Sequence, residues 1–122
     1  MSGQPVLLDL DGFLPLYELP NAQRLVPEII GMFLREADNL LGEAFLGVAD
    51  GDLTRVDRAA HGLRGSSSFV GAARLKVDAE ALELAAEHGL VAEVVPRLER
   101  VVETLRQTRP LLLAALENPP LS

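Results

Sequence analysis

Apolar residues recur at helical spacing in four long segments of this chain, and glycines separate the segments. The first segment covers about residues 22–49, where apolar side chains fall at steps of three, four or seven residues. This spacing places one apolar stripe along a helix and predicts that the stripe is buried. The stripe consists of Val26, Ile30, Phe33, Ala37, Leu40, Ala44 and Val48.

The same periodicity predicts helices over residues 53–69, over residues 72–88 and from about residue 90 onward. Gly51 and Gly89 follow two of the predicted helix ends, where glycine is common. Pro110 lies inside the last segment, and a proline in a helix interior costs about 3 kcal/mol. We therefore expect a kink or a new short helix there. The three stripes are Leu53, Val56, Ala60, Leu63 and Ser67; Leu75, Ala79, Leu82 and Ala86; and Val91, Val94, Leu98, Val101, Val102 and Leu105.

Short links between long amphipathic helices favour antiparallel neighbours. We therefore predict an all-α fold, an antiparallel up-down four-helix bundle. The pattern of residues 9–19 predicts a short extra N-terminal helix, interrupted near Pro15, across one end of the bundle. A length of 122 residues is typical of one domain. We expect a single domain over residues 1–122, with an ordered core of about 9–116 and tails at 1–8 and 117–122.

The composition excludes several classes of function. With 11 basic and 18 acidic residues, the chain has a net charge of −7 and is poorly suited to nucleic acid. It has no cysteine, and its two histidines lack a nearby metal-ligating partner, so we expect no bound metal. No apolar run approaches the roughly 18 residues of a membrane span, and no signal peptide is recognisable. We expect a cytoplasmic protein that binds neither nucleic acid nor membrane.

The run AHGLRGSSS, which starts at residue 60, carries the strongest functional signal. Helical geometry places His61 about 120° from the centre of the buried stripe of its helix, on an outward polar face. An imidazole is a nucleophile near neutral pH, an arginine can bind phosphate oxygens, and a glycine lets a partner approach closely. The pattern favours phosphoryl chemistry on His61, with an ordinary surface histidine as the alternative. The same side of the helix carries Thr54, Asp57, Arg64, Gly65 and Ser68.

The sequence AHGLRGSSSFVGA, followed by Leu75 and by Leu82-Glu83, resembles the signature of histidine-phosphotransfer (Hpt) domains of two-component phosphorelays. The strong similarity covers residues 51–89, and a weaker similarity extends back through the helix that contains Phe33. Arg64 stands where this family usually has lysine. The resemblance implies a four-helix bundle with a shorter N-terminal helix across one end.

The resemblance also implies residue roles. His61 would accept a phosphoryl group from a receiver-domain aspartate and pass it to another receiver. Arg64 would stabilise the phosphate, Glu83 would orient the imidazole, and Gly65 would leave room for the partner. Ser68 and Asp57 are counted with the binding surface. The residues alone leave other interpretations open: Arg64 paired with Asp57 or Glu83, Gly65 packed against a neighbouring helix, and Glu83 simply solvated.

The expected partners are receiver domains of response regulators, with a hybrid histidine kinase as a further candidate. The resemblance points to the preceding helix for apolar docking contacts, with Phe33 and Ala37 as candidates. Phe69 and Val70 are assigned to the core, and His88 to a helix end. We expect a monomeric carrier without kinase activity and without a cofactor of its own, the Mg²⁺ needed for transfer belonging to the receiver.

Two alternatives share the same helical fold. The first is the substrate domain of a chemotaxis-type histidine kinase, phosphorylated from ATP by a separate catalytic domain. The second is an adaptor that binds receivers without carrying phosphate. The intact set of His61, Arg64 and Gly65 argues against the adaptor.

Overall fold

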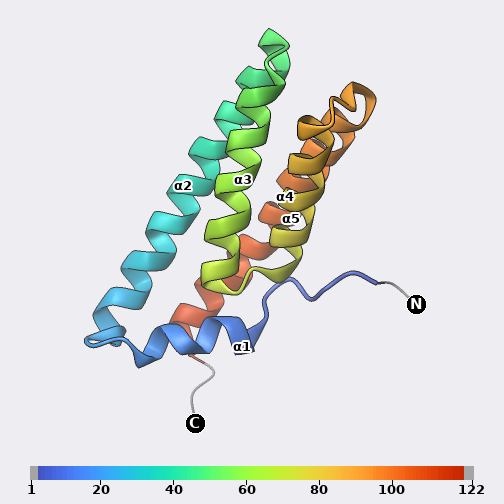
Figure 1. The fold of residues 1–122 in the computed structure, drawn as a ribbon. Coiled ribbons are helices and arrows are strands. Elements are labelled where there is room, and N and C mark those ends of the chain that lie inside the picture. The colour runs from blue at the N-terminus through green and yellow to red at the C-terminus, as the bar shows by residue number, and fades with distance from the viewer. Residues whose placement is uncertain (1–2, 120–122) are drawn as a thin grey trace.

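A computed structural model describes residues 3–119, and every regular element in that part of the chain is helical (Figure 1). The helix α3 packs against α2 and α4, and α4 packs against α5, with a smaller contact between α2 and α5. The predicted all-α class is confirmed, and the ends of the long helices agree closely with the sequence pattern. The elements are α1 (Leu10–Phe13), the 3-10 helix η1 (Leu14–Glu18), α2 (Ala22–Asp50), α3 (Leu53–Val70), α4 (Ala73–Glu87) and α5 (Val91–Glu117).

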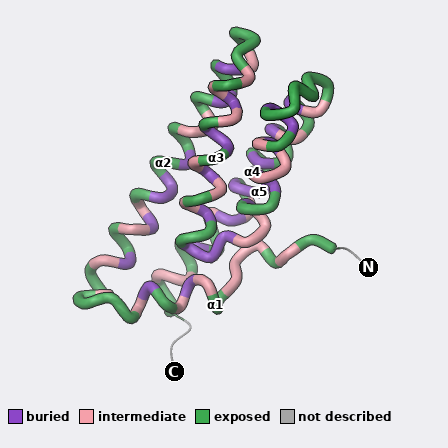
Figure 2. The backbone as a smooth tube through the Cα atoms, viewed as in Figure 1, coloured by how far each residue is buried: buried purple, intermediate pink, exposed green. Residues whose placement is uncertain are grey.

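The core lies along the facing sides of the long helices, where the buried residues of Figure 2 are concentrated. The predicted stripes of α2, α3 and α4 are buried, apart from Leu40, Val48 and Leu53, which are partly exposed. Ser67 is completely buried, as expected for a small residue at a helix contact. None of the described helices is both long enough and apolar enough to cross a membrane. The core therefore occupies one side of α3 and leaves its opposite side to solvent.

The stripe predicted for α5 is wrong at two positions. Val91 is 68% exposed and Val102 is 37% exposed, whereas Val94, Leu98 and Val101 are buried. Val101 and Val102 are sequence neighbours, and consecutive residues point about 100° apart around a helix. Only one of the two valines can therefore face the core. Val91 is the first residue of α5 and lies outside the core.

The helix α5 continues through Pro96 and Pro110 as one helix, so the new short helix expected at Pro110 does not form. Leu105 and Leu112 flank Pro110 and are 3% and 0% exposed. Burying a leucine side chain stabilises a fold by about 1.5–3 kcal/mol. Two such contacts offset the roughly 3 kcal/mol cost of the proline.

Gly71 joins α3 to α4 and also contacts the N-terminal helix. Its φ of 79° lies in the left-handed region that glycine adopts without strain. The Asp9 N–H donates to the Gly71 carbonyl at 2.8 Å. A Cβ at Gly71 would lie 2.7 Å from both the Asp9 carbonyl oxygen and the Phe13 nitrogen. Glycine at this position therefore allows the start of α1 to pack directly on the α3–α4 turn.

The segment before α1 is attached to the start of α4. The Arg74 N–H donates to the Val6 carbonyl at 3.1 Å, and Arg74 Nε donates to the Pro5 carbonyl at 2.9 Å. Pro5 and Val6, which the sequence assigns to a tail, are therefore held through their backbone carbonyls, which any sequence provides. At the other end α5 extends to Glu117. Residues 1–2 and 120–122 of the predicted tails lie outside the described residues.

Candidate functional site

His61 lies in the middle of α3, with 64% of its side chain exposed. The helix starts after Asp52, whose carboxylate accepts a hydrogen bond from the Arg55 N–H at 3.1 Å and so caps the first turn. From that start, Val56, Ala60 and Leu63 point into the core. The outward orientation predicted for His61 is therefore confirmed.

Glu83 extends from α4 to the imidazole. Its Oε2 lies 2.7 Å from Nδ1 of His61, and its side chain is only 13% exposed. An ionised carboxylate can only accept hydrogen bonds, so Nδ1 carries the ring proton and donates a hydrogen bond to Glu83. In the neutral ring, Nε2 is then the nitrogen that keeps its lone pair. The arrangement leaves one ring nitrogen held by α4 and the other free to react.

Arg64 lies on the same side of the imidazole as Glu83. Its Nε is 3.2 Å from Oε1 of Glu83, and its Nη2 is 3.2 Å from Nδ1 of His61. Because Nδ1 donates to Glu83, it has no lone pair to accept a hydrogen bond from Nη2. The contact that persists in this tautomer is the ion pair between Arg64 and Glu83. Of the two partners considered from the sequence, the structure thus records Glu83 and not Asp57.

The outward side of α3 is open beyond His61. Gly65 is exposed, and beyond the backbone of its own helix a Cβ built on it would meet no atom of residues 3–119 within 4 Å. This result rules out close packing of another helix as the reason for glycine at this position. Ser68 is exposed and Asp57 is half-buried, and both lie within about two turns of His61 on the same helix.

The comparisons with known proteins bear directly on these residues. The family model for the Hpt domain matches residues 28–110, which is more than half of the chain and includes His61, Arg64 and Glu83. The chain belongs to the Hpt domain family. It is thus a histidine-phosphotransfer protein of the kind that serves phosphorelays. No curated protein matches the chain.

Two solved structures have a similar fold. Histidine-containing phosphotransfer protein B (HptB) from Pseudomonas aeruginosa PAO1 is 22% identical, with a TM-score of 0.84 over 91% of this chain and 95% of that one. A rice protein described as a "putative histidine-containing phosphotransfer protein" is 24% identical, with a TM-score of 0.77 over 91% of this chain and 83% of that one. At these identities the likeness shows that the Hpt fold is shared.

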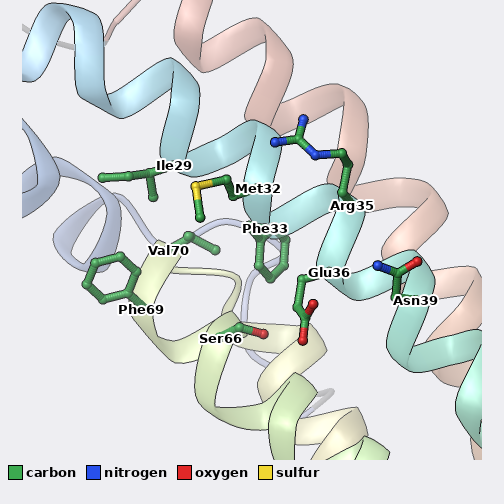
Figure 3. A pocket seen from close by; sticks show the side chains of 9 residues that line it. All are labelled: Ile29, Met32, Phe33, Arg35, Glu36, Asn39, Ser66, Phe69 and Val70. Carbon is green, nitrogen blue, oxygen red and sulfur yellow. The ribbon is translucent and has the colours of Figure 1, made fainter.

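A groove between α2 and α3 lies beside the site of this Hpt domain (Figure 3). Two large apolar side chains at the groove are exposed: Met32 at 61% and Phe69 at 58%. Phe69 follows His61 by eight residues, which places the two about 12 Å apart along α3 and about 80° apart around it. The groove is lined by Ile29, Met32, Phe33, Arg35, Glu36, Asn39, Ser66, Phe69 and Val70.

The structure corrects three sequence-based assignments at this groove. Ala37 is completely buried and cannot contact a partner, and Phe33 is 4% exposed and reaches the groove only from the core. Phe69 was predicted to be in the core and is exposed, whereas Val70 is buried as expected. The missed signal is an apolar residue that lies off the buried stripe of its helix. Met32 and Phe69 both have this property.

Proposed function

We propose that His61 carries a phosphoryl group from an aspartate of one receiver domain to an aspartate of another. The observation that supports this most is an exposed imidazole whose Nδ1–H is held by Glu83 at 2.7 Å. Nε2 attacks the phosphorus of the aspartyl phosphate in line. The N–P bond forms as the P–O bond to the receiver breaks, and the electron pair leaves with the receiver's carboxylate.

Glu83 contributes to this transfer through charge. Nδ1 keeps its proton throughout, so the imidazole becomes positively charged when Nε2 is phosphorylated. A carboxylate 2.7 Å from Nδ1 stabilises that charge as it develops. In the reverse step the phosphoryl group leaves to the next receiver and the neutral ring is restored. The chain acts as a carrier in both steps.

The receiver docks on the open side of α3. Gly65 gives the loops around the aspartyl phosphate room to approach Nε2, because no other element in the described part of the chain comes within 4 Å of the position of its missing Cβ. Met32 and Phe69 offer apolar contact area at the groove, with Ser68 and Asp57 on the polar part of the surface. The Mg²⁺ of the reaction is bound by the receiver. Once His61 is phosphorylated, Arg64 can bind the phosphate oxygens with its guanidinium.

The test is transfer of labelled phosphate from a panel of phosphorylated receiver domains. We expect the wild-type protein to be labelled, and the label to be lost in acid and retained in base, as for phosphohistidine. His88 is the matched control because it is the other histidine of the chain and caps the end of α4. The His88→Ala variant should be labelled like wild type, and His61→Ala should take no label while unfolding at the same temperature.

Labelling of His61→Ala at the wild-type level would overturn the assignment. A second arm supplies ATP with the catalytic domain of a chemotaxis-type kinase. Labelling by that route, with none from any receiver, would instead identify the chain as a kinase substrate domain.

A further inference from the structure

Glu83 is a largely buried carboxylate with two different partners. Its side chain is 13% exposed, its Oε2 accepts from His61 Nδ1 at 2.7 Å, and its Oε1 lies 3.2 Å from Arg64 Nε. These are the two partners that the structure records for Glu83 within residues 3–119. A carboxylate that has lost most of its water needs a donor for each oxygen. The Arg64 contact therefore supports the orientation of the carboxylate that holds the imidazole.

Both donors come from one helix, and the guanidinium lies on the Nδ1 side of the ring. Arg64 follows His61 by three residues, so the two side chains lie one above the other on α3. Nη2 of Arg64 is 3.2 Å from Nδ1, the ring nitrogen that does not react. Before phosphate arrives, the cation is thus engaged with Glu83 rather than placed beside Nε2.

We propose that Arg64 is a positioning residue: in the unloaded protein it fixes Glu83, and Glu83 in turn fixes the Nδ1–H tautomer of His61. The effect on phosphotransfer rests on the proposed role of His61, whereas the contacts among Arg64, Glu83 and His61 do not depend on that role. It also gives a reason for arginine at this position. A lysine ammonium is a compact charge on a flexible stem, whereas the guanidinium is planar and presents several donors in a fixed arrangement. Lysine should therefore hold Oε1 less firmly.

The test measures the tautomer directly, by two- and three-bond ¹H–¹⁵N correlation NMR of the His61 ring in the unphosphorylated protein, at a pH where the ring is neutral. Arg64→Met removes every donor and keeps an unbranched side chain, and Arg64→Lys is the conservative variant. Arg58→Met is the matched control, because Arg58 lies three residues before His61 on the same helix and is not paired with Glu83. Thermal unfolding checks that each variant is folded.

We expect the Nδ1–H form to predominate in wild type and in Arg58→Met, to become the minor form in Arg64→Met, and to be intermediate in Arg64→Lys. The rate of transfer from a phosphorylated receiver should fall about tenfold in Arg64→Met, equivalent to about 1.4 kcal/mol in the barrier. A tautomer population equal to wild type in Arg64→Met would overturn the inference. It would do so even if that variant changed the lifetime of the phosphohistidine.

If Arg64→Met does not fold, the Arg64→Lys tautomer decides, and a population equal to wild type would count against the inference. The tautomer readout needs no phosphotransfer. A protein that shows the expected tautomers but takes no label would therefore contradict the proposed function and leave the positioning role standing.

Discussion

Two carboxylates of α4 each accept a hydrogen bond from a side chain of a neighbouring helix, one from α5 and the other from α3. Asp78 accepts a hydrogen bond from Thr104 Oγ1 of α5 at 2.6 Å, and Glu83 accepts one from His61 Nδ1 of α3 at 2.7 Å. The two donors differ in exposure, since Thr104 is 5% exposed and the His61 side chain is 64% exposed. A hydroxyl enclosed in the core can only contribute to stability. An exposed imidazole has a second nitrogen, and under the proposed function its hydrogen bond prepares that nitrogen to accept a phosphoryl group.

The largest effect is expected at the enclosed pair, from Thr104→Val. Valine has the shape of threonine but leaves the buried Asp78 carboxylate without this donor, which should lower the free energy of unfolding by about 2 kcal/mol. Thr108→Val is the matched control, because the Thr108 hydroxyl is also buried but donates to the Thr104 carbonyl within α5. Its cost should be about 0.5 kcal/mol. Urea unfolding measures the free energy of unfolding of both variants. Equal losses would mean that the hydrogen bond to Asp78 contributes no more to stability than the bond within α5.

The exposed pair is tested by Glu83→Gln, which should act on rate more than on stability. The amide keeps the shape of the side chain but offers one acceptor oxygen to two donors, His61 and Arg64. We expect phosphotransfer to slow about tenfold, which corresponds to about 1.4 kcal/mol. Glu80→Gln, one turn earlier on α4, serves as the control and should transfer at the wild-type rate. Equal rates for the two variants would mean that the Glu83 contact does not assist the transfer.

The smallest effect is expected at a third carboxylate, which is exposed and paired within one helix. Hydrogen bonds from Arg106 and Gln107 lower the pKa of Glu103 from 4.5 to about 2. A lowered pKa in the folded state means that the stabilisation is present above pH 4.5 and is lost as the pH falls toward 2. NMR titration of the Glu103 carboxyl should show the low midpoint, and Arg106→Gln should raise it. Stability at neutral pH should change little, because exposed ion pairs contribute weakly.

The sequence predicts the helices and the outward face of α3 well, for a physical reason. Val56, Ala60 and Leu63 repeat at helical spacing on a helix whose other side is polar, so the buried side is unambiguous. The prediction fails for Val91 and Val102 because α5 carries apolar residues on more than one side. Periodicity identifies a face only when the rest of the helix contrasts with it.

The contacts within the site are less accessible to sequence analysis. The family resemblance suggests that Glu83 lies near His61, but the pairing of Arg64 with Glu83 depends on which rotamer reaches across two helices. Sequence spacing allowed Asp57 equally well. The apolar residues of the expected docking surface are wrong for a related reason. Phe33 and Phe69 are both apolar, and only packing decides that Phe33 is buried and Phe69 is exposed.

The attachment of the N-terminal segment has a practical consequence. Pro5, Val6 and Asp9 bond to Arg74 and Gly71, at the elbow between the helix that carries the imidazole and the helix that carries its carboxylate partner. A deletion of residues 5–9 would remove these hydrogen bonds and should loosen the turn that joins the two helices.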